Sequence, residues 1–281
     1  MNAWTDAAGV EHGRARGEVR IASLVPSITE LLFSLGLGEQ VVARTTFCIH
    51  PAEGVARVPR VGGTKTVRID RLLAARPSHV IMNVEENRRE DAEAIAAEGP
   101  QVIVTYPREP LDNPPLYRLL GNVFDRADAA ERLCAAFEAA HRRLAEAARR
   151  YPERRVLYLI WRDPWMAVSR GTYISRTLAL AGLHTVPDDT ADDYPEVSMD
   201  EHTLDDTDFV LFSSEPFPFK DKHLDEARAL CGDARTPFAF IDGEMTSHSE
   251  ARRAGAPVAI RAQARARRVS WHARSLTPAR S

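Results

Sequence analysis

Short apolar runs alternate with segments of helical spacing along most of the chain. Apolar residues three and four positions apart predict helices at residues 27–35, 69–75, 89–98, 175–181 and 220–230. The apolar runs, each expected to form a strand, lie at residues 20–25, 41–43, 80–83, 102–105, 156–161, 166–169, 209–212 and 238–241. Strands that alternate with helices in this way indicate βαβ units, and therefore an α/β fold with mainly parallel sheets.

One predicted helix is much longer than the others. Residues 127–150 contain neither Gly nor Pro, and their apolar residues recur three and four positions apart. At 1.5 Å per residue this helix would be about 36 Å long, which is the diameter of a domain. We therefore predict two α/β lobes, residues 20–125 and 151–247, joined by a backbone helix at residues 126–150.

The first predicted helix carries signals at both of its ends. The segment Ser27-Ile28-Thr29-Glu30 has the form of a capping box, in which Ser27 precedes the helix and Glu30 bonds back to its amide. Gly36 is expected to end the helix, because glycine enters the left-handed region at little cost.

The composition is that of a folded protein with a sizeable core. Of the 281 residues, 44% are apolar and 27% are charged. The longest apolar runs, such as residues 156–161, fall far short of the roughly 20 residues that a membrane-spanning helix needs. The net charge of −3 is uneven: residues 248–281 hold eight arginines and one glutamate, so the preceding 247 residues carry −10. An acidic body argues against nucleic-acid binding.

The two ends of the chain differ from the body. Residues 1–19 are predicted to be a disordered extension, and they lack the apolar core of a secretory signal. As written, the chain is expected in the cytoplasm, or in the periplasm if the true start lies elsewhere. The three cysteines are widely spaced and form neither a disulfide framework nor a zinc signature.

Candidate ligand contacts in the first lobe follow the predicted strands, because ligands of α/β proteins bind at the carboxyl ends of strands. Thr46 and His50 come after the strand at 41–43, and Asn83 closes the strand at 80–83. His50 could ligate a metal through its imidazole or bond within its own loop. Turn hydrogen bonding explains Thr46 and Asn83 as well as a ligand does.

Aromatic residues dominate the candidates in the second lobe. Trp161 and Trp165 flank a proline turn and could form a flat wall against a large planar ligand. Core packing explains Trp161 equally well, whereas Trp165 is expected to be exposed. Phe217 lies in a stiff Phe-Pro-Phe loop, which could line a pocket or plug the core.

Polar candidates in the second lobe are Tyr173, Glu215 and Glu244. Each glutamate follows a predicted strand and could accept hydrogen bonds from amide groups of a ligand, or could simply lie on the surface. No phosphate-binding loop, zinc-protease motif or nucleophile elbow occurs. We therefore predict a protein that is not an enzyme and has no catalytic residue.

Several segments occur together in an informative order. They are Ser23-Leu24-Val25-Pro26-Ser27-Ile28-Thr29-Glu30, Leu35-Gly36-Leu37-Gly38, Pro59-Arg60-Val61-Gly62-Gly63, Arg76-Pro77-Ser78-His79-Val80-Ile81, Gly171-Thr172-Tyr173-Ile174-Ser175 and Ser213-Ser214-Glu215-Pro216. Over about residues 20–245 the chain resembles the cobalamin- and iron-siderophore-type substrate-binding proteins of ABC importers. The resemblance implies two lobes that clamp a metal chelate in a cleft.

The resemblance also implies a function and its contacts. We expect non-enzymatic binding of a corrinoid such as cobalamin, or of a related metal chelate, by a monomer that needs no catalytic cofactor and has an importer permease as a possible partner. The contacts would come from Thr46, Asn83, Trp161, Trp165, Tyr173, Glu215, Phe217 and Glu244. The alternatives are a free-metal receptor using His50, Glu86 and Glu244, and a corrinoid- or tetrapyrrole-processing enzyme, such as a chelatase, with His50 as base.

The tail departs from the family pattern. After Met245-Thr246-Ser247 the family has closing helices, whereas residues 248–281 are rich in Arg, Ala and Ser. A reading-frame change would explain this difference, and so would a native, solvated basic tail.

Overall fold

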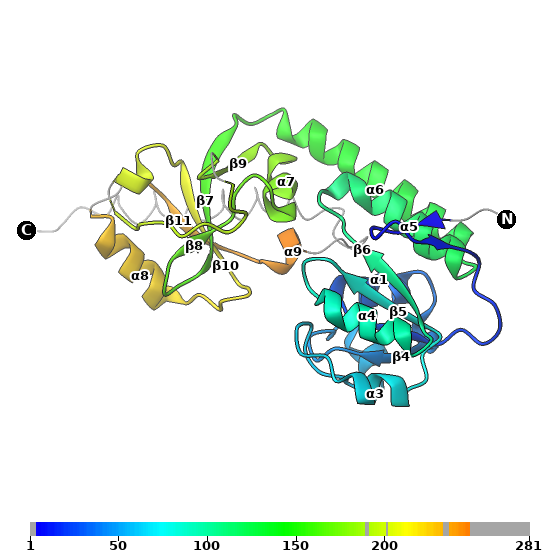
Figure 1. Cartoon of the computed structure of the whole chain (residues 1–281). Coiled ribbons are helices and arrows are strands. Elements are labelled where there is room, and N and C mark those ends of the chain that lie inside the picture. The colour runs from blue at the N-terminus through cyan, green and yellow to red at the C-terminus, as the bar shows by residue number, and fades with distance from the viewer. Residues whose placement is uncertain (1–3, 189–190, 201, 233–235, 248–281) are drawn as a thin grey trace, which may run out of the picture. The chain divides into compact units, whose positions relative to one another are not determined.

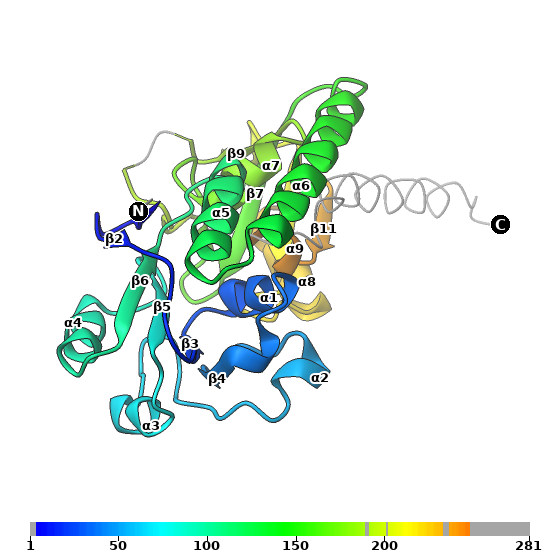
Figure 2. The same cartoon turned by 90° about the vertical axis from the view of Figure 1, so that its right-hand side faces the viewer.

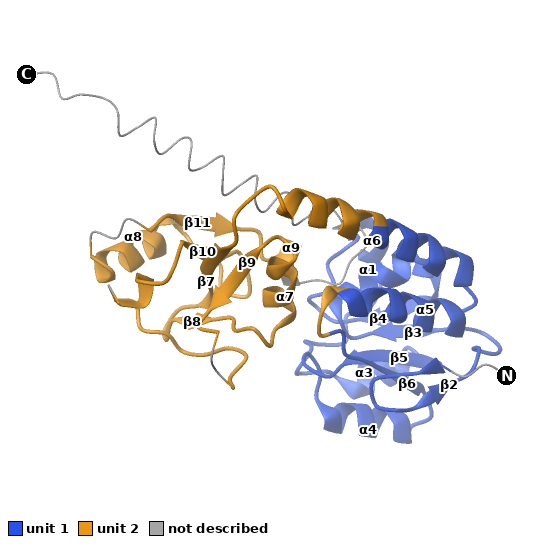
Figure 3. Ribbon diagram, turned by 90° about the horizontal axis from the view of Figure 1, so that it is seen from above, with its two compact units in different colours: residues 1–107, 111–138, 249–251 blue, residues 108–110, 139–248, 252–281 orange. Residues whose placement is uncertain are grey.

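The protein is described here by a computed structural model, which describes residues 4–188, 191–200, 202–232 and 236–247. The chain divides into two compact units (Figure 3). Among the described residues, unit 1 contains those up to Pro107 and Leu111–Glu138, and unit 2 contains the rest. Both units combine a parallel-rich sheet with helices, so the predicted α/β class is confirmed. The basic tail lies outside the described residues.

Unit 1 is built on a four-stranded parallel sheet with the strand order β4-β3-β5-β6 (Figures 1 and 2). Its strands are β3 (Ile21–Ser23), β4 (Val41–Arg44), β5 (His79–Asn83) and β6 (Gln101–Thr105). Its helices are α1 (Pro26–Ser34), α2 (Ala52–Val55), α3 (Ile69–Ala74), α4 (Arg89–Ala97) and α5 (Asn113–Val123), with 3₁₀ turns at Gly38–Gln40 and Pro110–Asp112.

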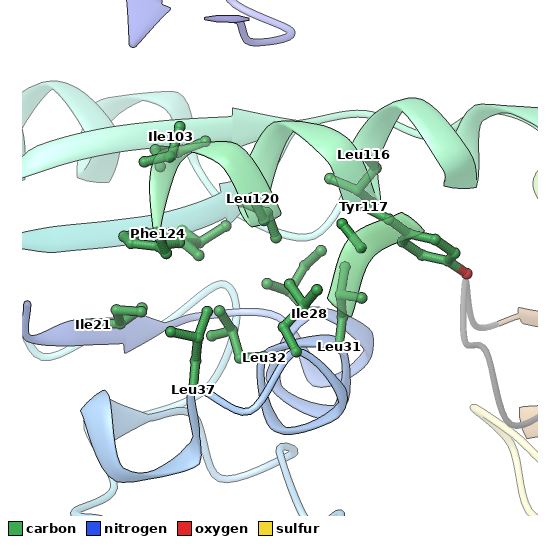
Figure 4. Packing of buried hydrophobic residues seen from close by; sticks show 14 of the residues in the cluster. Ile21, Ile28, Leu31, Leu32, Leu37, Ile103, Leu116, Tyr117, Leu120 and Phe124 are labelled. Atoms are coloured by element: carbon green, nitrogen blue, oxygen red, sulfur yellow. The ribbon is translucent and has the colours of Figure 1, made fainter. Parts of the chain in front are cut away.

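Helix α5 packs against α1 in the main core of unit 1 (Figure 4). Leu116, Tyr117 and Leu120 of α5 are buried in one cluster with Ile28 and Leu31 of α1. The spacing of the α5 residues is that of one helix face. The same cluster contains Ile21, Ile81 and Ile103 of the sheet, so α1 and α5 cover one of its sides.

Helix α1 does not open with the predicted capping box. The helix begins at Pro26 with Val25 as its N-cap, and no side chain caps it. Ser27 and Glu30 lie inside the helix and are buried. Proline is pre-organised for the first helical position, so the helix begins two residues earlier than a cap at Ser27 predicts. Gly36, at φ +75°, does follow the end of the helix as predicted.

Residues 4–19 form an ordered segment, here called the N-terminal strap, so the prediction of disorder is wrong for them. Strands β1 (Trp4–Thr5) and β2 (Glu11–His12) pair as an antiparallel hairpin. The Asp6 carboxylate is fully buried and lies 3.0 Å from His12 Nε2. It also accepts a hydrogen bond from the Val104 amide of β6. The strap therefore covers part of the free edge of strand β6.

Unit 2 contains a five-stranded sheet in which β11, β10, β7 and β8 follow one another and β9 also pairs with β7. All its pairings are parallel except β7 with β8. The strands are β7 (Arg154–Trp161), β8 (Met166–Ala167), β9 (Leu183–Val186), β10 (Phe209–Ser213) and β11 (Phe238–Ile241). The helices are α7 (Tyr173–Ala179), α8 (Asp221–Leu230) and α9 (Glu244–Ser247), with a 3₁₀ turn at His202–Leu204.

The long helix α6 (Ala127–Ala148) belongs to both units. Residues up to Glu138 belong to unit 1, where Ala130 and Cys134 are buried in the core with α1 and α5. From Ala139 onward the helix belongs to unit 2, where Leu144 packs against strand β7. Across the described residues, every helix is too short or too polar to cross a membrane.

Candidate functional site

The loop after β4 presents two exposed apolar side chains at the carboxyl edge of the unit 1 sheet. Phe47 is 60% exposed and Ile49 is 52% exposed. Thr46 ties this loop to its neighbour, because its amide and its Oγ1 both donate to the Gly62 carbonyl, at 2.8 and 3.2 Å. A Cβ added at Gly63 would lie 3.3 Å from the Phe47 ring, so a glycine leaves room for that ring. Thr46, which was predicted as a ligand contact, thus holds its loop against the loop that contains Gly62.

The loop after β5 is held by amide side chains. Asn83 Oδ1 accepts a hydrogen bond from the Glu85 amide at 2.8 Å, which closes a turn. The buried Asn87 side chain accepts from the Asn83 amide and donates to the carbonyls of Leu24 and Thr64. A single side chain therefore fixes three loops at this edge, and Val84 stands 49% exposed beside them.

In unit 2, Trp161 and Phe217 form an aromatic pair at the carboxyl edge of the sheet. Their rings meet edge to face with centroids 5.5 Å apart, and Trp161 is 41% exposed. The Phe217 amide donates to the Ile160 carbonyl at 3.3 Å, which fixes the loop after β10 against the end of β7. Trp161 and Phe217, both predicted as ligand contacts, therefore lie in contact with each other.

Trp165 does not have the predicted exposure. Its ring stacks on Phe219 at 6.0 Å with an interplanar angle of 2°, and it meets Phe212 edge to face at 6.4 Å. The Arg162 guanidinium lies over the same ring at 5.8 Å. The proline turn folds Trp165 back onto the core, so the exposure expected for this residue belongs to Trp161 instead.

Two neighbouring loops of unit 2 carry the predicted carboxylates. Glu215 follows β10, and Glu244 begins α9 after β11. A Cβ added at Gly243 would lie 2.7 Å from Glu215 Cγ, so these loops touch. Tyr173 begins α7, which packs against α9. Tyr173, Glu215 and Glu244 are all half-buried.

The buried Tyr158 hydroxyl supports both of these loops from below. It lies 3.2 Å from Ser213 Oγ and 2.7 Å from Thr246 Oγ1. Ser213 Oγ accepts from the Glu215 amide, and Thr246 donates to the Gly243 carbonyl. Burial raises the pKa of Tyr158 to about 12, so the phenol stays protonated at neutral pH.

The geometry does not support the alternative of a free-metal receptor that uses His50, Glu86 and Glu244. His50 and Glu86 lie on loops of unit 1, whereas Glu244 lies in unit 2. In the described part of the chain, no three His, Cys, Asp or Glu side chains gather in a way that could hold a metal ion. Catalysis by His50 likewise has no further observation behind it.

A hollow of about 810 Å³ lies elsewhere in unit 1. Its walls are residues 6–13 of the strap, helix α4 and strands β5 and β6. Asn83 and Val84 line it, but neither the exposed Phe47 nor any other residue of its loop does. The hollow is therefore separate from the apolar loop after β4.

The comparisons with known proteins agree with this architecture. A family model described as "Periplasmic binding protein" matches residues 21–234. The chain belongs to this family. Its members are substrate-binding proteins of importers, which bind their ligands without catalysis. The resemblance found in the sequence is thereby confirmed.

Relatives in the family carry informative names. The Vitamin B12-binding protein of Pectobacterium atrosepticum is 24% identical over 187 residues, which cover 65% of this chain and 67% of that protein. The periplasmic Vitamin B12 binding protein BtuF of Vibrio cholerae has a TM-score of 0.73 at 18% identity, over 86% of this chain and 94% of that one. The periplasmic heme-binding protein RhuT from Roseiflexus sp. RS-1, in apo form, reaches 0.73 at 24% identity, over 87% and 97%.

The described structure brings the predicted contacts together in two sets. Thr46 and His50 share one loop of unit 1, and Asn83 closes the strand β5. Trp161, Phe217, Glu215 and Glu244 lie on adjoining loops of unit 2. Phe47, Ile49 and Val84 were not predicted as contacts, although each is an exposed apolar residue in a loop that follows a strand.

Proposed function

We propose that this chain binds a corrinoid of the cobalamin type and delivers it to the permease of an ABC importer. The observation that carries the proposal is the pair formed by the exposed Trp161 and the half-buried Phe217 at the carboxyl edge of the unit 2 sheet. Aromatic faces and edges suit a broad, flat ligand with apolar surfaces. The Vitamin B12-binding relative supports cobalamin in particular.

The remaining contacts fit the two kinds of surface that a corrinoid offers. Phe47 and Ile49 in unit 1 would cover apolar parts of the ligand, as Trp161 and Phe217 would in unit 2. Glu215 and Glu244 would accept hydrogen bonds from the amide side chains of the corrin ring. Tyr173, Thr46 and Asn83 stay as proposed polar contacts, while Trp165 would act by supporting the aromatic loop.

The place of action follows from the same reasoning. Both solved structures compared above are named as periplasmic proteins. We propose the same compartment for this chain, where a permease would receive the loaded protein. The body of the chain is acidic, and no nucleic-acid partner is proposed.

A titration with cyanocobalamin tests the proposal. We expect saturable binding with one ligand per chain, seen as quenching of Trp fluorescence and as a change in the corrin absorption. Hemin and Zn²⁺ are titrated in parallel. Saturable binding of hemin or of Zn²⁺ without binding of cyanocobalamin would contradict the corrinoid proposal and assign another ligand class.

The variant Trp161→Ala identifies the surface that binds. Loss of an aromatic contact at the centre of a binding surface typically costs 2 kcal/mol or more, so we expect the Kd to rise about thirtyfold. Tyr151→Ala is the matched control, because Tyr151 has the same 41% exposure but follows helix α6 instead of a strand. Equal Kd values for the two variants would show that Trp161 is not a contact.

A further inference from the structure

Arg44 is a buried cation at the end of strand β4. Only 3% of Arg44 is exposed to solvent. Its Nε donates to the Val55 carbonyl at 3.0 Å, and one terminal nitrogen donates to the carbonyls of Thr45 and Cys48, at 3.2 and 2.9 Å. Among the described residues, no carboxylate forms a salt bridge with this guanidinium. All of its recorded partners are main-chain carbonyls of the segment that follows β4.

The base of this segment is closed by main-chain bonds of the same residue. The Arg44 amide donates to the Pro59 carbonyl at 3.0 Å, and the Val61 amide donates to the Arg44 carbonyl at 2.9 Å. Arg44 is also in register with Ser23 of β3. The stem of the side chain is therefore fixed in the sheet, and the guanidinium braces the loop from inside.

The braced loop is the one that presents the apolar surface of unit 1. Phe47 and Ile49 are mostly exposed, although each is one residue away from Cys48, which is fully buried. We infer that Arg44 is a positioning residue, which holds Phe47 and Ile49 in the geometry that the ligand requires. This inference rests on the proposed function, because it assigns a purpose to the held loop. Arg44 itself is too deeply buried to touch a ligand.

The chemistry of the side chain explains why an arginine stands here. The planar guanidinium directs N–H groups from separate nitrogens, so one residue can serve carbonyls on both arms of the loop. A lysine has a single nitrogen and cannot reach Val55 and Cys48 with the same geometry. The Val55 carbonyl ends the short helix α2, and it accepts from the Val58 amide at 3.1 Å as well as from Arg44 Nε.

Hydrogen exchange of the ligand-free protein is the first part of the test. In Arg44→Lys we expect faster exchange at the amides of Thr46, Cys48 and Ile49, each of which is bonded within or beside the loop. Amides of the core helix α5 should keep their wild-type rates. Unchanged exchange in the loop would overturn the inference, and so would an equal increase throughout unit 1, since that is general destabilisation. Arg68→Lys, at an exposed arginine, is the control.

Ligand binding is the second part, and it uses a double-mutant cycle. Arg44→Lys should weaken cyanocobalamin binding about tenfold, because a loose loop must be ordered on binding. If Arg44 acts through the loop, the same change in a Phe47→Ala background should cost less than about threefold. Equal effects in both backgrounds would overturn the positioning role. If the wild-type protein does not bind cyanocobalamin, the proposed function fails, and the exchange data still decide whether Arg44 holds the loop.

Discussion

Tyr158 is the largest polar side chain in the core of unit 2, and a single hydroxyl gives it its role. The phenol is fully buried, yet it lies within hydrogen-bond distance of Ser213 and Thr246. Those two residues in turn bond the loops that carry Glu215 and Glu244. Burial is the main cause of the raised pKa of Tyr158, and the negative charges of Glu215 and Asp242 add to it.

The variant Tyr158→Phe tests this support. It removes the hydroxyl and leaves the ring in place, so we expect a loss of about 1–2 kcal/mol in the free energy of unfolding, the usual cost of a lost buried hydrogen bond. Urea unfolding followed by circular dichroism measures it. Tyr151→Phe, at an exposed ring, should change stability by less than about 0.5 kcal/mol. A Tyr158→Phe protein as stable as the wild type would show that the hydroxyl supports nothing.

At the scale of single residues, the sequence predicts correctly which side chains lie near the ends of strands. It predicts their exposure less well. Trp161 and Trp165 were both placed at the end of β7, but the turn between them reverses the expected exposure. Asp163 has a φ of +64°, a value that no local pattern announces. Ser27 has the form of a cap, but Pro26 takes the first helical position, so Ser27 lies inside the helix and is buried.

At the scale of elements, the N-terminal strap protects the free edge of strand β6. An unpaired edge strand can pair with another chain, and proteins commonly cover such edges. The Ala7 amide donates to the Val104 carbonyl, and Asp6 accepts from the Val104 amide, so the strap satisfies both main-chain groups of this edge residue. The Asp6 carboxylate also accepts from the amides of Ala8 and Val10, which closes the hairpin.

The strap should loosen in acid. Burial alone would raise the pKa of Asp6, but hydrogen bonds from Val104, His12, Val10 and Ala8 together outweigh burial and lower it. A carboxyl whose pKa is lowered by folding stabilises the fold above its unfolded pKa of about 4, and this contribution is lost as pH falls through the folded value. We expect the protection factors of the strap amides, which are corrected for the intrinsic pH dependence of exchange, to fall below about pH 4.

Asp6→Asn is the matched variant for this measurement, because it keeps the size but replaces one acceptor oxygen with a donor. Its strap amides should have low protection factors at neutral pH, and these protection factors should not fall further below pH 4. A second buried group acts at higher pH. Burial lowers the pKa of His79, so the fold favours the neutral ring, and protonation of His79 begins to destabilise unit 1 below about pH 6.5. An Asp6→Asn strap that still loosens below pH 4 would assign the acid response to another group.

Two of the elements that the sequence patterns missed have identifiable physical causes. Helix α5 opens with Asn113-Pro114-Pro115, which has the composition of a loop, although proline is well tolerated in a first helical turn. The strap is short, and its contacts are with residues about a hundred positions away: Asp6 and Ala7 bond Val104, and the Ala15 amide donates to the Val123 carbonyl. Long amphipathic segments such as α6 were predicted nearly to the residue, because their pattern is local.

At the scale of the whole molecule, each unit repeats one design. A parallel sheet ends in loops that are locked by buried polar side chains, Arg44 and Asn87 in unit 1 and Tyr158 in unit 2. The locked loops hold apolar side chains in water, which is costly unless something covers them. Each unit therefore offers apolar side chains at the carboxyl edge of its own sheet.

A pair of substitutions, one in each unit, tests whether one ligand uses both edges. Phe47 and Trp161 belong to different units, so their effects on a common ligand should be independent. We expect Phe47→Ala and Trp161→Ala each to weaken cyanocobalamin binding by at least about tenfold, and the double variant to weaken it by the product of the two factors. Isothermal titration measures each Kd, and thermal unfolding without ligand verifies that each variant is folded. If Phe47→Ala binds like the wild type while Trp161→Ala does not, the ligand belongs to unit 2 alone, and the loop after β4 must present its apolar residues to a different partner.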